Sequence, residues 1–491
     1  MGCIALFVVA SFAAIANSSP FRDEINSTTN LETGSRQGWT SPPYKRGTMD
    51  ILWGCGSTIM LCCWSMLCLN VPGPQDTLWV QLRRKISIFI FMLIAPEVAA
   101  ISAMGQYLSA HQSVKDFTDA KIGDWSLQHA FFADMGGFVL QPRDWVSFPI
   151  NAKQLLWLVQ RDYVTVPPAV LGRIKDRNKA DAMARTIIAM QATWFLANFF
   201  TRLAQGLDIT LLELTTVAYI YASLGTVFLW RHKPADVRVP EVLTTNASMA
   251  EILLAGGDDA REPYSNTPLD FVDRKEWFWS LYWQYTRRLL QYLKMLSTPS
   301  TRPIDRFSTF IAPNVPPWIF HSGALYYFGF AGILLAGWNL KLPTQGEQVL
   351  WRVATAIHFA CLVAGEVVTE IAFNIWPYIC ERRSRRASVS ETGEGNANQT
   401  SSSGCAVTPT LLNTTRPQPR TIWDWMRNNS EAQDPRVRLP LKAALPCYFI
   451  VSVYIIVRMI ILVEDFVELR SLPASCFDTP KWQQFVPHIG R

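Results

Sequence analysis

Long apolar stretches constrain this chain more than any other feature of its sequence. The seven stretches lie at about 51–69, 86–108, 187–205, 211–230, 317–338, 353–376 and 441–463. Each is close to the roughly 20 residues that an α-helix needs to cross a bilayer, where every backbone amide must be bonded within the chain. The sequence therefore predicts an all-α fold, a polytopic membrane bundle with about seven transmembrane helices.

The composition agrees with a membrane protein. Of the 491 residues, 49% are apolar and 17% are charged, whereas about 25% of a typical soluble domain is charged. The net charge of +6 comes from scattered Lys and Arg pairs. Such pairs are typical of segments that contact anionic lipid, and they differ from the basic stripe of a nucleic-acid-binding face. We expect the lipid bilayer as a partner and no nucleic acid.

The N-terminal segment has two interpretations. Residues 1–16 are mostly apolar, end in small residues and precede a polar stretch, which is typical of a cleaved signal peptide. A short first helix that is retained is the alternative, because the segment lacks the usual positive charge at its start. Residues 17–50 then form an irregular leader.

The remaining segments divide into a core and its connections. Residues 51–376 are predicted to be a six-span membrane core with long segments at 109–186 and 231–316, followed by a seventh span at 441–463 and a C-terminal tail at 464–491. Residues 377–440 are predicted to be a disordered linker, because the part from 381 to 420 has almost no large apolar side chain.

Two shorter segments inside the long connections have their own predictions. Residues 276–296 combine aromatic and basic side chains at helical spacing, which favours a helix lying in the membrane interface, with a buried helix as the alternative. Residues 128–140 are too short to span and are expected to form a re-entrant or interfacial element.

Two signals disagree about orientation. A cleaved signal peptide places residues 17–50 in the lumen. If all seven spans cross the membrane, the three long segments lie in the lumen as well. Those segments carry clustered positive charge at Lys175, Arg231 and Arg382–Arg386, which the positive-inside bias places in the cytosol. Glycosylation sequons fit the luminal placement and occur at Asn26, Asn246, Asn398, Asn413 and Asn428. Orientation and oligomeric state stay open, and we expect the endoplasmic reticulum or another endomembrane as the location.

Carboxylates within the apolar stretches are the candidate catalytic groups. Glu366, Glu370 and Asn374 follow one another at intervals of four residues and share one helix face, with His358 near its edge. Carboxylates are costly inside a bilayer, so they indicate an inward-facing site. The structural alternative is that they stabilise the bundle by hydrogen bonds or ion pairs. Two carboxyls in a low dielectric resist ionising together, so one is expected to remain an acid.

A third candidate acid lies beside a proline. Glu97 follows Pro96 inside the second stretch, where the proline frees a backbone carbonyl and opens the helix. Tyr326 and Tyr327 of the fifth stretch, and Trp194 and Asn198 of the third, are expected to line a substrate pocket with His358 and Asn374, since aromatic faces attract cations. Three acidic residues after the last span, Glu464, Asp465 and Glu468, are expected to be solvated.

Other chemistries lack their usual signals. The sequence has no P-loop, no dinucleotide fingerprint and no zinc-protease or serine-hydrolase motif. Its ten cysteines include no C-x-x-C spacing, and six of them lie inside apolar stretches. We expect no metal and no cofactor.

Several short motifs resemble those of a family of fungal multi-pass membrane proteins. The motifs are Arg46–Trp53, Leu69–Pro74, Ala95–Glu97, His129–Phe138 and Trp482–Ile489. The resemblance covers most of the chain and implies a multi-pass topology, whereas most members have no assigned activity. In functional type the chain is similar to the membrane-bound terpene cyclases of secondary metabolism.

Two function classes use these residues, and a structural or scaffolding membrane protein is the alternative to both. The first is a membrane enzyme that cyclises an epoxidised isoprenoid or meroterpenoid, a lipophilic small molecule, with Glu366, Glu370 or Glu97 as the initiating acid. The second is a transporter, channel or sensor in which the same carboxylates form an ion or proton path.

Overall fold

The computed structural model describes fifteen stretches of the chain. They are residues 36–41, 46–74, 76–165, 168–235, 237, 239–261, 264, 266–273, 303–307, 309, 317–371, 375, 379, 382 and 441–480. The predicted signal segment at 1–16, the helix at 276–296 and nearly all of the linker at 377–440 lie outside these residues, as do Asn26, Asn374, Asn398, Asn413 and Asn428.

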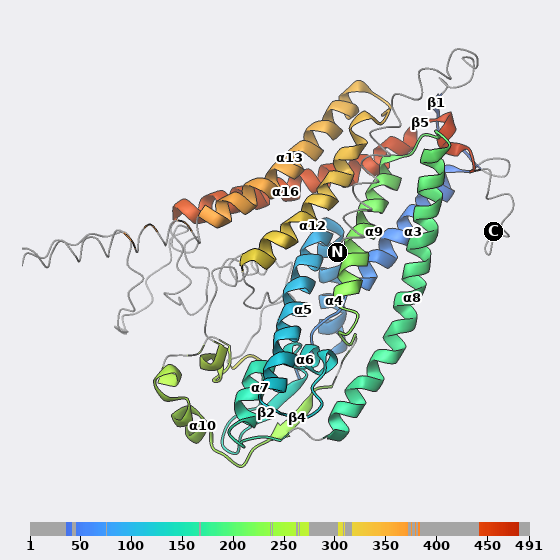
Figure 1. Ribbon diagram of the computed structural model, residues 1–491. Helices are drawn as coiled ribbons and strands as arrows, with labels where there is room; N and C mark the ends of the chain where they lie inside the picture. The colour runs from blue at the N-terminus through green and yellow to red at the C-terminus, as the bar shows by residue number, and fades with distance from the viewer. Residues whose placement is uncertain are drawn as a thin grey trace, which may run out of the picture.

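The described residues are mostly helical and form eleven α-helices (Figure 1). The helices are α3 (Thr48–Ser65), α4 (Leu78–Ile94), α5 (Pro96–Asp119), α6 (Leu127–Asp134), α7 (Ala152–Val159), α8 (Pro168–Ala204), α9 (Leu211–Leu229), α10 (Met249–Ala255), α12 (Pro317–Ala336), α13 (Gln345–Glu370) and α16 (Leu441–Val467). The strands are β1 (Arg36–Gln37), β2 (Phe138–Gln141), β3 (Phe148–Ile150), β4 (Glu241–Thr244) and β5 (Leu472–Pro473).

Three of the described helices are long and apolar enough to cross a membrane, or four if the bent pair α4–α5 counts as one span. They are the segments Leu211–Leu229, Gln345–Val368 and Leu445–Arg470. Helices α3, α8 and α12 overlap three further predicted spans. The stretch at 86–108 is not one helix as predicted, because α4 ends at Ile94 and α5 turns away from it by 108° after Pro96.

Helix α9 lies at the centre of the bundle. It packs against α3, α5, α8, α12 and α16, and 78% of its most apolar window is buried, compared with 28% for α13 and 22% for α16. A helix that is apolar on all sides is expected in such a central position. Thr210 begins it as an N-cap: its side chain accepts the Glu213 N–H, and the Glu213 carboxylate accepts the Thr210 N–H.

The outer helices carry apolar side chains on their exposed faces. On α3 these are Trp53, Met60 and Trp64, and on α8 they include Ile187 and Met190, all of which are exposed at helical spacing. Exposed apolar surface of this extent marks contact with lipid or with another protein.

A small subdomain lies at one end of the bundle, around α6, α7 and α10 (Figure 1). Its sheet has the order β3-β2-β4, with β2 antiparallel to β3 and parallel to β4. Residues 128–140, predicted to be re-entrant or interfacial, form α6 and β2, and Phe132 and Phe138 are buried in the subdomain core. Gly136 joins the two elements at a φ of 78°, which glycine adopts without strain. The all-α prediction thus missed these strands.

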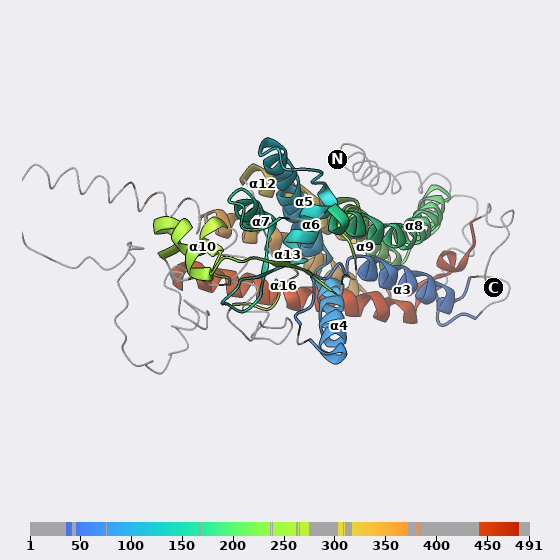
Figure 2. The same cartoon turned by 90° about the horizontal axis from the view of Figure 1, so that it is seen from below.

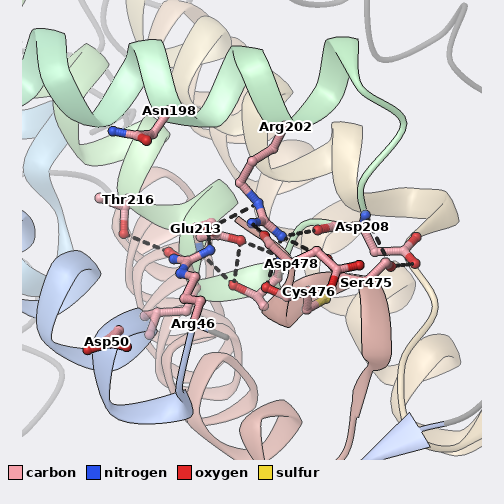
Figure 3. A network of polar contacts seen from close by, with 12 residues as sticks. Arg46, Asp50, Asn198, Arg202, Asp208, Glu213, Thr216, Ser475, Cys476 and Asp478 are labelled. Atoms are coloured by element: carbon pink, nitrogen blue, oxygen red, sulfur yellow. Dashed lines mark hydrogen bonds and ion pairs between the residues drawn. The ribbon is translucent and has the colours of Figure 1, made fainter. Parts of the chain in front are cut away.

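The opposite end of the bundle is held by a buried arginine. Arg202 of α8 donates to the carbonyls of Asp208, Cys476 and Asp478 at 2.7 to 2.9 Å, and its Nε lies 3.8 Å from Glu213 (Figure 3). Arg46 forms a second ion pair with Glu213 at 2.6 Å. These contacts attach residues 475–478 to α8 and α9, and we call this end the Arg202 end.

Replacing Arg202 should loosen the Arg202 end. Arg202→Met leaves several backbone carbonyls and the Glu213 carboxylate with fewer buried donors, and removing one partner of such a buried pair costs about 3 to 5 kcal/mol. Thermal unfolding of the detergent-solubilised protein should show a clearly lower midpoint than wild type. Arg143→Met, at an exposed position of the subdomain, serves as the control and should change the midpoint little. An equal effect of both variants would contradict the anchoring role.

Candidate functional site

The break between α4 and α5 creates an unusual need for hydrogen bonds. Pro96 has no N–H, and the bend removes the helical donors for the last carbonyls of α4. Side chains of other helices replace them: the Tyr219 hydroxyl of α9 donates to the Leu93 carbonyl, and Arg458 Nε of α16 donates to the Ile94 carbonyl at 2.8 Å. Two further helices therefore stabilise the bend.

Glu97 lies directly after this break and is fully enclosed. It is 1% exposed, and its Oε1 accepts a hydrogen bond from the Tyr454 hydroxyl of α16. His358 Nε2 of α13 lies 3.8 Å from the same oxygen. Glu97 is in the first turn of α5, where the helix dipole favours a negative charge. We call Glu97, Tyr219, His358, Tyr454 and Arg458 the apex cluster.

The apex cluster contains buried polar atoms without hydrogen-bond partners among the described residues. They are Glu97 Oε2, both ring nitrogens of His358 and Arg458 Nη1. A buried polar atom without a partner costs free energy, so each one needs an explanation. His358 and Arg458 are both 0% exposed and lie near the middle of the candidate spans of α13 and α16. The cluster is therefore deep in the bundle.

The structure separates the predicted acids into two places. It brings Glu97 and His358 together, whereas Glu366 lies eight residues beyond His358 on α13, or about 12 Å along the helix axis. Glu366 accepts a hydrogen bond of 2.6 Å from the Tyr327 hydroxyl of α12. Glu370 lies one further turn along α13.

The other predicted pocket residues have packing roles or face outward. The Tyr326 ring stacks on Tyr221 at 4.6 Å, and its hydroxyl donates to backbone carbonyls of α9. Trp194 is 40% exposed on α8, which packs mainly against α3, α6 and α9. The Asn198 amide donates to the Trp194 carbonyl of the same helix at 2.9 Å, and its side chain is directed away from the Arg202 contacts (Figure 3).

The three carboxylates predicted to be solvated, Glu464, Asp465 and Glu468, are all buried, and Glu464 is 4% exposed. Asp465 accepts a hydrogen bond of 2.9 Å from the Thr215 hydroxyl, and Glu468 caps α9 by accepting the Leu211 N–H at 2.6 Å. Both are at most 1% exposed, because β1, β5 and residues 474–478 cover this end of the bundle. The sequence gives no local signal for this cover.

The exposed sequon Asn246 lies between β4 and α10.

A second buried cluster, missed by sequence reasoning, lies between the bundle and the subdomain. Lys233 is 0% exposed, and its Nζ donates to Gln106 Oε1 at 2.9 Å and approaches Asn70 Oδ1 at 3.4 Å. Trp230 Nε1 donates to the same Gln106 oxygen at 3.0 Å. Burial removes water from the ammonium group and lowers the pKa of Lys233 to about 8.

The lowered pKa of Lys233 makes stability depend on pH. Between pH 8 and the ordinary value of 10.5, the unfolded chain binds a proton that the folded chain has released, so the free energy of unfolding rises with pH, by up to about 3 kcal/mol. Denaturant unfolding at pH 8 and at pH 10.5 should show this rise. Lys233→Met should abolish most of it and raise stability at pH 8. Lys121→Met, an exposed position, should leave the rise intact.

A protein-family model matches residues 23–255 and 430–489 of the chain. The chain belongs to DUF8562, a family of unknown function. The matched residues include the bend with Glu97, the Tyr219 hydroxyl, Tyr454 and Arg458 of α16, and the Arg202 contacts. Helices α12 and α13, with His358 and Glu366, lie outside the DUF8562 match. Comparisons with curated proteins and with solved structures found no match.

Proposed function

We propose that this protein is a multi-pass endomembrane protein that binds and releases a proton at the Glu97–His358 pair, as a proton-coupled transporter, channel or sensor does. The observation that carries the proposal is the 3.8 Å approach of His358 Nε2 to Glu97 Oε1 in a fully buried setting. Ionisable groups inside a membrane bundle are rare and typically serve ion or proton movement.

The surroundings of the pair suit a proton-dependent change. With a proton on His358, the imidazolium and Glu97 form an ion pair, and without it the two meet as a neutral ring and a carboxylate. The positive charge of Arg458 and the N-terminus of α5 hold the carboxylate in either case. A change of charge on His358 therefore alters the contact between α13 and the bend, because α5 carries Glu97 and α13 carries His358.

Infrared difference spectroscopy tests this proposal directly. The protein in lipid nanodiscs is stepped from neutral to acid pH, and the bands of the histidine ring and of the carboxyl groups are recorded. We expect His358→Gln to remove a histidine protonation band, and Glu97→Gln to shift its pH midpoint. His111→Gln, at an exposed histidine, is the matched control and should leave that band unchanged. Identical spectra of wild type and both cluster variants would exclude proton binding at the pair.

The surroundings of Glu366 favour a second function, the acid-initiated cyclisation of an isoprenoid. Beside the Tyr327 hydroxyl, aromatic rings follow one another: Tyr327 and Phe328 lie 4.7 Å apart between centroids, and Phe328 and Phe359 lie 5.5 Å apart. A carboxylic acid here would give its proton to a terminal epoxide, and aromatic faces would stabilise the resulting cation. The resemblance to fungal membrane proteins and the apolar surroundings favour a lipophilic isoprenoid or meroterpenoid.

Conversion of a terminally epoxidised prenyl substrate by membranes from a heterologous host tests the second function. The product would be a cyclic isomer of equal mass, formed without nucleotide or metal. Glu366→Gln should lower turnover by roughly 10²-fold or more, the scale of general acid catalysis. Glu370→Gln tests the neighbouring acid in the same assay. Unchanged turnover in both variants would remove these acids from the reaction, and no conversion by well-expressed wild type would exclude the cyclase.

A further inference from the structure

The two ends of the bent pair α4–α5 lie at the same end of the bundle. Just before α4, the Val71 N–H donates to the carbonyl of Met135, a residue of the subdomain that follows α5, at 3.1 Å. Asp76, at the start of α4, forms an ion pair with Arg306, and Phe307 lies against Gly136. The chain therefore enters α4 beside the subdomain, and it leaves α5 in the subdomain.

One residue joins the two arms of the pair halfway along. Arg84 Nη2 of α4 donates to Thr309 Oγ1 at 2.9 Å, and Gln106 Nε2 of α5 donates to the Thr309 carbonyl at 2.9 Å. Arg84 and Gln106 lie at nearly equal distances along the chain from the break. In one continuous helix they would be about 33 Å apart, so the chain folds back at the break, and the two arms diverge from a common apex with a bend of 108°.

The apex of the pair reaches the middle of the bundle. Leu93 and Ile94 at the end of α4 accept hydrogen bonds from Tyr219 and Arg458, which lie near the middle of the candidate spans of α9 and α16. Figure 2 shows α4 standing out from the remaining helices. Its exposed side chains Leu82, Ile86 and Ile90 follow one another at intervals of four residues, which suits contact with lipid.

We propose that α4 and α5 form a re-entrant helical hairpin, which enters the membrane from the subdomain side, turns at Ala95–Pro96 near the midplane and returns to the same side. Irregular backbone is tolerated at that depth only where protein side chains satisfy it, and Tyr219 and Arg458 do so here. This inference rests on topology and does not depend on the proposed proton function.

A re-entrant hairpin determines on which sides of the membrane the leader and the subdomain lie. Residue Arg46 contacts Phe477 and Glu213 at the Arg202 end, and α3 then runs to Asn70 beside Lys233 at the subdomain end. Only α3 crosses the membrane between the leader and the subdomain, so the two lie on opposite sides. A luminal leader then places the subdomain in the cytosol. Arg231 follows α9 beside Lys233 on the subdomain side, where the positive-inside bias places a basic residue in the cytosol.

Cysteine labelling in sealed, right-side-defined microsomes tests the hairpin. The seven described cysteines are free and buried, and Cys3, Cys380 and Cys405 are replaced by Ser to give a silent background. Single cysteines are then introduced as Pro74→Cys before α4, Asp119→Cys at the end of α5, and Trp39→Cys before α3, all at exposed positions. We expect a membrane-impermeant maleimide added to the cytosolic side to label positions 74 and 119 and to label position 39 only after permeabilisation.

Each outcome of the labelling decides one part of the inference. Labelling of positions 74 and 119 from opposite sides would show that α4–α5 crosses the membrane and would overturn the hairpin. Labelling of 74 and 119 only from the lumen would keep the hairpin but overturn the orientation. The unmodified chain gives a second measurement, since Asn246 should carry no glycan, and sensitivity of an Asn246-dependent band to endoglycosidase would contradict a cytosolic subdomain.

Discussion

The hydrogen bonds of two carbonyl groups decide much of this architecture. The bend at Pro96 turns the following N–H groups away from the Leu93 and Ile94 carbonyls, in the interior of an apolar bundle where water is scarce and an unbonded carbonyl is costly. Tyr219 and Arg458 supply the donors. These bonds require Tyr219 of α9 and Arg458 of α16 to lie within hydrogen-bond distance of the bend. The central helix and the last helix are thus both tied to the break at Pro96.

A buried guanidinium at the bend also explains why Glu97 is tolerated. An isolated carboxylate inside a low-dielectric bundle is strongly unfavourable, whereas one beside a cation, a tyrosine hydroxyl and a helix N-terminus is compensated. The compensation is incomplete, because Glu97 Oε2, both nitrogens of His358 and Arg458 Nη1 have no hydrogen-bond partner in the described part of the chain. Of these groups, the carboxyl and the imidazole can bind a proton, whereas the guanidinium stays charged.

The sequence predicted the parts that depend on local pattern. Apolar runs located α9, α13 and α16, whereas Pro96 indicated only a local opening beside Glu97 within a single span and not the 108° break. The direction of the second arm could not be predicted, because it depends on contacts with Thr309, Tyr219 and Arg458, which are distant in the chain. The pairing of β2 with β4 was missed because the two strands are distant in the chain and each has only four residues. Burial of Asp465 depends on a cover formed by the leader and the C-terminal segment.

The bond between Arg458 and Ile94 joins residues 364 positions apart, and this separation has a consequence for biosynthesis. The ribosome produces α4, α5 and α9 long before it produces α16. During that interval Tyr219 can donate to the Leu93 carbonyl. The donors of the Ile94 carbonyl and of the Glu97 carboxylate, Arg458 and Tyr454, are not yet present because both belong to α16. A chain that stops before residue 441 lacks both donors, so its bend keeps an unbonded carbonyl and an uncompensated carboxylate until the last helix is in place.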